Sequence, residues 1–131
     1  MGILLDLKAL MNKILSCLWI PINTGVWKGR KYLDGTFDIW REYTGSPAGG
    51  AHYTTINGFY GYYDNDFYFP LDCRPITTNY FLQVTWQIGS GFNIDCSGLA
   101  RSLDKFNIYA LSTAANISTY SASIYIHGRW K

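Results

Sequence analysis

The sequence predicts an all-β protein: an antiparallel β-sandwich or a barrel-like head domain, preceded by a short N-terminal α-helix. Hydrophobic residues make up 48% of the 131 residues and charged residues only 15%, which favours one domain with a packed core. Aromatic residues reach 18%, and such side chains fit the half-buried surfaces of strands. The 13 glycines are scattered, as the turns between many short strands require. We therefore expect a helix over residues 1–20 and a β-rich head over residues 21–131.

The first residues carry the only helical periodicity that we recognise. Apolar residues recur at spacings of 3, 4, 3 and 4 at Leu4, Leu7, Met11, Ile14 and Leu18. This is the a/d seam of a coiled coil, although two heptads are fewer than such an assignment normally needs. An isolated helix of this length must pack on something. We predict a helical bundle between copies of the chain, with a helix docked on its own domain as the alternative. Pro21 is expected to end the helix.

The first predicted strands form a hairpin. Two strand-like runs, Val26–Leu33 and Thr36–Tyr43, are separated by Asp34-Gly35, and an Asp-Gly pair between such runs is a strong hairpin signal. We expect Trp27 and Trp40 to face each other across this hairpin and to pack on the sheet.

Further strands follow at short intervals. The aromatic run Phe59–Leu71 is interrupted by Asp64-Asn65-Asp66, where we expect a turn. Tyr80–Ile88 and Tyr120–His127 alternate cleanly between apolar and mostly polar residues, and Phe106–Leu111 reads as another strand. Short strands at this spacing indicate a sandwich or a barrel.

Composition argues against several functional classes. The net charge is +2 and no basic run exceeds Arg30-Lys31, so we expect no nucleic-acid binding. Charged and polar residues interrupt the apolar N-terminal stretch, so we expect neither membrane insertion nor a cleaved signal. The odd number of cysteines, Cys17, Cys73 and Cys96, predicts reduced thiols, with an intermolecular bridge or a Cys73–Cys96 bridge as open alternatives.

We find no set of residues that would support catalysis. His52 and His127 are the only histidines, and no G-x-S-x-G nucleophile motif is present. The acidic residues offer many pairs, of which the sequence selects none for glycosidase chemistry. Asp64-Asn65-Asp66 lacks the spacing of a calcium loop. We therefore expect no enzyme, no metal and no cofactor.

Motifs at both ends of the β-rich region resemble a known family. The segment from Gly25 to Trp40 follows the pattern G-x-W-x-x-R-K-x-x-D-G-x-x-x-x-W, and the chain ends in Gly128-Arg129-Trp130-Lys131. Both are similar to the opening hairpin and the terminal strand of the C-terminal domains of bacteriophage tail fibres. A middle stretch is also similar, although Phe69-Pro70-Leu71-Asp72-Cys73 departs from that family's F-P-F-x-F.

This resemblance implies a host-recognition protein of a phage or prophage, located in the virion tail and made in the bacterial cytoplasm. It also implies a homotrimer that contacts other phage tail proteins, which agrees with the coiled-coil seam. We expect Arg129 and Trp130 to secure the last strand through a cation–π or salt-bridge contact.

The predicted function is adsorption to a bacterial surface polysaccharide or a teichoic-acid-type glycan. Sugars stack on exposed aromatic rings beside carboxylates and amides. The candidate glycan-binding residues are Tyr60, Tyr62, Tyr63, Asp64, Asn65, Asp66 and Tyr68. The alternative for these side chains is packing in the core or between subunits. The alternative functions are a purely structural tail-tip or baseplate protein and a small cell-wall hydrolase.

Overall fold

The computed structural model describes residues 2–47, 54–88, 93–99 and 102–131. A single helix, α1 (Gly2–Cys17), precedes the strands in this described part of the chain. The strands are β1 (Trp19–Thr24), β2 (Trp27–Tyr32), β3 (Thr36–Gly45), β4 (Thr54–Ile56), β5 (Phe59–Tyr68), β6 (Phe81–Ile88), β7 (Asn93–Leu99), β8 (Lys105–Ser112) and β9 (Tyr120–Arg129).

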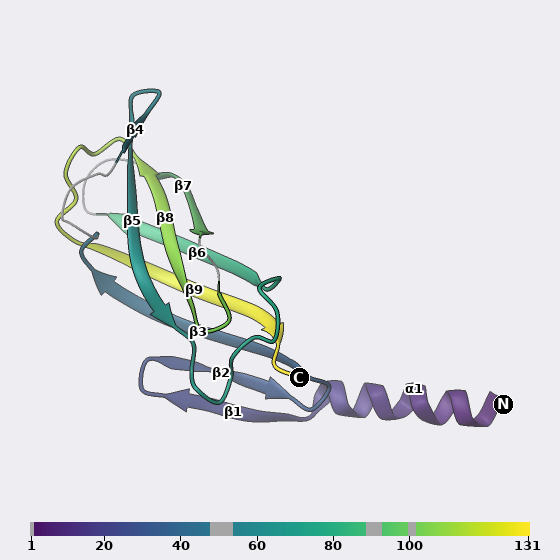
Figure 1. Cartoon of the computed structure of the whole chain (residues 1–131). Coiled ribbons are helices and arrows are strands. Elements are labelled where there is room, and N and C mark those ends of the chain that lie inside the picture. Colours follow the sequence, from purple (N-terminus) through teal and green to yellow (C-terminus); the bar gives the residue numbers. More distant parts are fainter. Residues whose placement is uncertain (1, 48–53, 89–92, 100–101) are drawn as a thin grey trace.

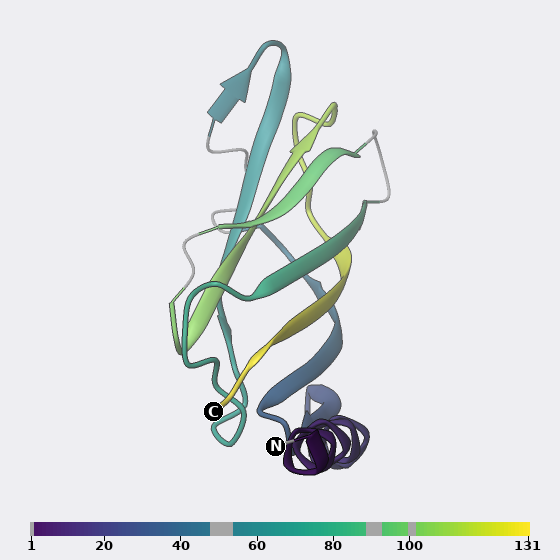
Figure 2. The same ribbon diagram turned by 90° about the vertical axis from the view of Figure 1, so that its right-hand side faces the viewer.

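The strands form two antiparallel sheets, which confirms the prediction of a mostly β protein. The five-stranded sheet has the order β1-β2-β3-β9-β6, and the four-stranded sheet has the order β4-β5-β8-β7. Figures 1 and 2 show the two sheets as separate layers, with β5 and β8 lying over β3 and β9. One hydrophobic core joins their facing sides, with Ile39 and Ile124 from the larger sheet and Phe106 and Ile108 from the smaller one.

The helix extends away from both sheets (Figure 1). None of its residues is buried, and apart from the partly buried Leu15 the exposed fractions of its large apolar side chains run from 43% at Ile14 to 79% at Ile3. The docked-helix alternative is therefore wrong for this chain. The helix also ends at Cys17, before the expected stop at Pro21, which lies instead in β1 at the sheet edge. Proline is tolerated there because an edge strand has neighbours on one side only.

The predicted hairpin is confirmed as β2 and β3, but its turn contains three residues. Lys31 pairs with Phe37 and Lys28 pairs with Trp40. Gly35 has a φ of +96°, as the left-handed residue of a three-residue turn requires. Compared with the expected two-residue Asp34-Gly35 turn, the third turn residue shifts the pairing of β2 with β3 by one residue. Such a shift places Trp27 and Trp40 on opposite faces of the sheet. Trp27 is consequently buried whereas Trp40 is exposed, so the prediction that they face each other is wrong.

The C-terminus packs on the turn of this hairpin. The backbone N–H of Trp130 donates to the carbonyl oxygen of Gly35 (2.8 Å), and its indole N–H donates to the carbonyl oxygen of Tyr32 (3.0 Å). The ammonium groups of Lys31 and Lys131 lie 4.6 Å and 4.9 Å from the centre of the Trp130 indole. The expected cation–π contact therefore exists, but lysines supply the cations. The two family-like motifs thus form one structural unit, although they are distant in sequence.

The remaining strands agree with the alternation in the sequence, except at one point. The even-numbered residues of β6 from Leu82 to Trp86, and those of β8 and β9 from Phe106 and Tyr120 onwards, point into the core. Residues 64–66 do not form the expected turn, because β5 continues through them with a shift of register against β8. An irregularity of this kind lets a strand bend while its pairing continues. The sequence reading also missed β1, β4 and β7.

Candidate functional site

The tyrosines predicted to bind glycan lie on β5 and are divided between its two faces. Tyr62 is fully buried, and its hydroxyl donates to the carbonyl oxygen of Ala114. Tyr60, on the same face, is partly buried against the core, and Tyr63 points to the opposite face. A glycan on the surface cannot reach the Tyr62 ring, so the assignment of Tyr62 as a ligand residue is corrected. Alternation along the strand separates these side chains.

The rest of the predicted set does not gather around the tyrosines. Tyr68 is exposed at the far end of β5, with the Lys105 ammonium 5.7 Å from its ring centre. Asp64 points toward the other sheet, and the side chains of Asn65 and Asp66 lie outside the described residues. The described members of the set therefore do not form one binding surface.

Asp64 connects the two sheets. Its Oδ2 accepts hydrogen bonds from the hydroxyls of Tyr120 on β9 (2.5 Å) and Tyr43 on β3 (3.2 Å). Burial, and then the hydrogen bond to Asp64, raise the pKa of Tyr120 above its ordinary value. The phenol therefore remains a donor to the carboxylate. Asp64 therefore has a structural role, which is to link the two sheets.

A second aromatic and polar surface lies on the larger sheet, on the side that faces away from the core. We call it the outer face. Cross-strand register aligns its side chains in rows: Lys28, Trp40, Tyr125 and Gln83 in one, and Glu42, Ser123 and Thr85 in the next. Trp40 is 40% exposed, and Phe81, at the edge of this face, is 57% exposed. Exposed rings beside hydrogen-bonding side chains are the elements of a sugar-binding surface.

Hydrogen bonds hold several side chains of the outer face in position. Asp38 Oδ1 accepts a hydrogen bond from the Tyr125 hydroxyl (2.8 Å) and lies 2.7 Å from Nδ1 of His127. Glu42 Oε2 accepts a hydrogen bond from the Ser123 hydroxyl (2.6 Å). Partial burial, followed by the Asp38 carboxylate, raises the pKa of Tyr125 to about 12. Side chains fixed in this way lose less conformational freedom when a ligand binds.

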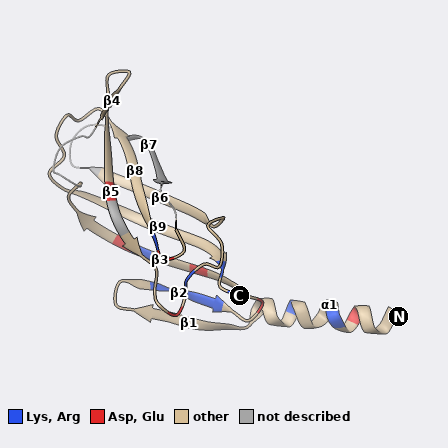
Figure 3. Ribbon diagram, viewed as in Figure 1, with Lys and Arg blue, Asp and Glu red and all other residues tan. Residues whose placement is uncertain are grey.

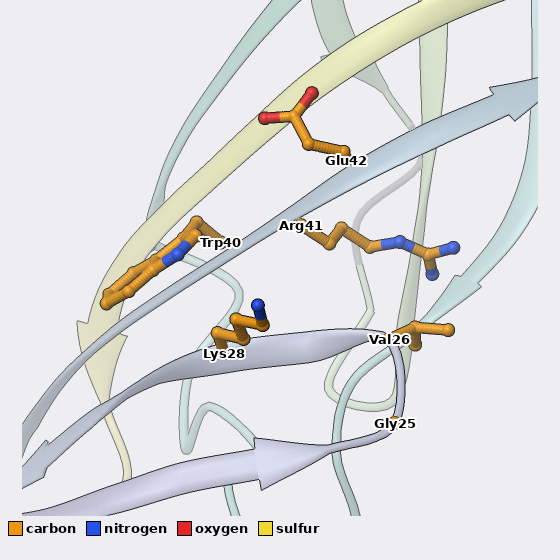
Figure 4. Close-up of a pocket in the computed structure, with 6 residues that line it drawn as sticks. All are labelled: Gly25, Val26, Lys28, Trp40, Arg41 and Glu42. Carbon is orange, nitrogen blue, oxygen red and sulfur yellow. The ribbon is translucent and has the colours of Figure 1, made fainter.

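A pocket opens at the corner where β2 separates from β3 (Figure 4). Its volume is about 500 Å³, and we call it the corner pocket; it is lined by Gly25, Val26, Lys28, Trp40, Arg41 and Glu42. It forms because β2 pairs with β3 only as far as the Lys28–Trp40 pair, after which β3 continues past the β1–β2 turn. Figure 3 shows charged positions of both signs along β3 and basic positions along β2 at this end of the fold.

Arg41 is the least usual residue of the corner pocket. It points to the inner side of β3, away from Trp40 (Figure 4), and its guanidinium carbon lies 5.3 Å from the Trp27 ring centre and 5.4 Å from that of Tyr43. Partial burial lowers the pKa of the guanidinium from its ordinary value. Its Nε is buried without a hydrogen-bond partner, and no carboxylate of the described residues pairs with it. A partly buried cation without an anion is a place where a bound anion would be stabilised.

The sequence reading missed this surface because its residues come from different strands. Trp40 was assigned to packing, and Lys28, Arg41 and Glu42 belong to no local motif. The available signal was the length of the hairpin turn, because a three-residue turn places Trp40 and Trp27 on opposite faces.

The predicted oligomerisation residues form a free apolar face on α1. Leu4, Leu7, Met11 and Ile14 are all exposed, and Leu18 directly follows the helix with its N–H donating to the Ile14 carbonyl oxygen (3.2 Å). The structure of the single chain does not test the trimer, which remains a prediction.

Other candidate centres are few in the described part of the chain. No group of three or more His, Cys, Asp or Glu residues could hold a metal ion there, and no described helix is long and apolar enough to cross a membrane. Cys17 is an exposed free thiol and Cys73 a buried one, whereas the side chain of Cys96 lies outside the described residues. Comparisons of the chain with family models, curated proteins and solved structures found no match.

Proposed function

We propose that the chain is the receptor-binding head of a phage tail fibre, which adsorbs to a bacterial surface polysaccharide or teichoic-acid-type glycan. In this proposal the two sheets form a β-sandwich head and α1 joins three copies in a coiled coil. The observation that carries the proposal is the outer face, where Trp40 and Phe81 are exposed beside rows of amide, hydroxyl and carboxylate side chains. Aromatic rings and hydrogen-bonding groups are what a sugar ring requires of a binding surface.

The packing of the chain end on the hairpin turn supports the family resemblance. The family-like hairpin and the terminal Gly-Arg-Trp-Lys are each short motifs, and either could arise by chance. Their contact through Trp130, Gly35 and Tyr32 gives both motifs one physical role, which is to close the last strand on the first hairpin. A shared role explains why the two patterns would occur together in one family.

The exposed helix supports assembly of several copies. No residue of the helix is buried, and burying large apolar side chains fully stabilises a protein by about 1.5–3 kcal/mol for each of them. Spacings of 3 and 4 place them on one stripe, so copies of α1 can bury them against each other. Three identical outer faces would then bind a repeating glycan together, and the second and third contacts would benefit from a high effective concentration.

The first test measures oligomeric state. Light scattering of the full chain should give three times the 14.9 kDa of one chain. A variant that begins at Leu18 keeps the hydrogen bond from the Leu33 N–H to the Leu18 carbonyl oxygen, so its β-rich part remains complete. We expect this variant to be monomeric. A full chain that is itself monomeric would contradict the trimer.

The second test measures glycan binding on an array of bacterial polysaccharides and teichoic acids. The full chain should bind a subset of them, and the variant that begins at Leu18 should bind the same subset at least about tenfold more weakly, because it lacks multivalency. Absence of binding across the array, together with a confirmed trimer, would favour the structural tail-tip alternative instead.

A further inference from the structure

The inference concerns which sugars bind and where, and it rests on the proposed glycan-binding function. We propose that the corner pocket binds an acidic pyranose, a sugar ring that carries a carboxylate or a phosphate group. The ring of Trp40 forms one wall of this site and the neighbouring Lys28 binds the anionic group, while Arg41 adds positive charge from the inner side of β3.

The charges around the pocket favour an anion. Lys28 and Arg41 contribute two positive charges to the lining, against the single negative charge of Glu42. That carboxylate already accepts a hydrogen bond from Ser123, which holds it on the outer face. The guanidinium of Arg41 has no carboxylate partner among the described residues, so its positive charge is not neutralised there. An acidic ligand would balance the excess positive charge of the lining.

The shape and the aromatic wall favour a sugar ring over a free anion. The pocket volume of about 500 Å³ falls in the range of small-molecule sites and is far larger than one phosphate or carboxylate requires. Trp40 and Val26 are both exposed and both line the pocket, so it offers apolar surface beside its charges. The apolar side of a pyranose can cover such a surface while its acidic substituent faces the cations.

The neighbouring strands can accommodate a longer chain. Beyond Trp40, β3 has no strand partner on the side of β2 in the described structure. On its other side the outer face continues across β9 to Gln83 and Thr85, whose amide and hydroxyl groups lie in the same rows as Trp40 and Glu42. An acidic residue in the corner pocket can therefore anchor a polysaccharide whose next units lie across the outer face.

The test uses the full chain labelled with ¹⁵N and follows the indole N–H signal of Trp40, one of five tryptophans. The signal is assigned by its loss in Trp40→Phe. Four ligands are titrated: glucuronate, glucose 6-phosphate, glucose and inorganic phosphate. We expect the two acidic sugars to shift the Trp40 signal at concentrations at least about fivefold below glucose, and this advantage should shrink at high salt.

Variants with matched controls test the roles of individual residues. Lys28→Gln should weaken glucuronate binding roughly three- to fivefold and leave glucose binding unchanged, as expected for one partly exposed ion pair. Arg30→Gln removes a cation from the same face of β2 outside the pocket and should change neither. Trp40→Ala should weaken both sugars about tenfold through lost stacking. Trp19→Ala is its control, because Trp19 is an exposed tryptophan on β1 outside the pocket.

Three results would overturn the proposal. These are glucose binding as tightly as glucuronate, inorganic phosphate matching the acidic sugars, and Lys28→Gln behaving like Arg30→Gln. The polysaccharide array distinguishes a wrong assignment of the pocket from a wrong proposal of glycan binding. If Lys28→Gln and Trp40→Ala bind the array as the unmodified chain does, glycan binding stands and the pocket assignment falls. If the unmodified chain binds no polysaccharide, the proposed function itself falls.

Discussion

Replacing Tyr120 by phenylalanine should destabilise the protein by about 2 kcal/mol, because a hydrogen bond to a charged group is worth about 1.5–3 kcal/mol. The substitution keeps the ring, which stacks on Trp86 with 3.9 Å between ring centres. It removes only the hydroxyl that donates to Asp64 at 2.5 Å. Asp64 retains its hydrogen bond from Tyr43 at 3.2 Å, so the carboxylate keeps one donor. The loss of unfolding free energy should therefore stay below the upper limit of about 3 kcal/mol.

Tyr43→Phe is the matched comparison. Its hydrogen bond to Asp64 is longer, and Tyr43 is less buried than Tyr120, so water can replace its hydroxyl. We expect a loss of about 0.5–1 kcal/mol. Both variants are measured by urea unfolding at pH 7 and one protein concentration, with the midpoint shifting and the slope unchanged. A Tyr120→Phe variant within about 0.5 kcal/mol of the unmodified chain would refute the role of this bond between the sheets.

Two further predictions concern the backbone and alkaline pH. Gly29→Ala should destabilise the protein by about 3 kcal/mol or more, because a Cβ there would meet the carbonyl oxygen of Asp38 and lie 2.8 Å from a backbone carbon of β3. Gly25→Ala meets nothing and should cost only about 1 kcal/mol through its left-handed φ of +63°; equal losses in urea unfolding would contradict this reasoning. Burial raises the pKa of Tyr125 from 10.0 and of Cys73 from 9.0, each to about 12. The folded state therefore keeps protons that the unfolded state releases, so the unfolding free energy should fall as the pH rises from about 8 to about 12. Cys73→Ala should flatten the first part of this decline. An unfolding free energy that stays constant up to pH 11 would contradict the raised pKa values of Tyr125 and Cys73.

Local sequence patterns were sufficient for most of the strands. Alternation in Tyr80–Ile88 and Tyr120–His127 fixed both the strand type and the inward-facing residues, because successive side chains of a strand point to opposite sides. The Asp34-Gly35 pair located the hairpin for a similarly local reason. The missed strands carry weaker signals. In β1 the residue Pro21 suggested the end of a helix, and only the position of β1 at the sheet edge makes proline acceptable there.

The candidate site was predicted poorly because binding surfaces depend on register and on strand order. The tyrosine-rich run of β5 suggested a glycan site, but alternation buries Tyr62 against the other sheet and pairing with Tyr120 turns Asp64 inward. One additional residue in the β2–β3 turn decides that Trp40 faces outward. Neither pairing can be read from the composition of one strand.

The sequence by itself determined the β class, the N-terminal helix with its apolar stripe, and the positions of the hairpin and of the alternating strands. Each of these follows from periodicity or turn chemistry within a few residues. The tertiary structure alone decided that the helix extends free of the sheets, that the chain end closes on Gly35, and that Lys28, Trp40 and Arg41 line one pocket. Those features arise from pairings between distant strands, and a shift of one residue in such a pairing exchanges the buried and exposed faces.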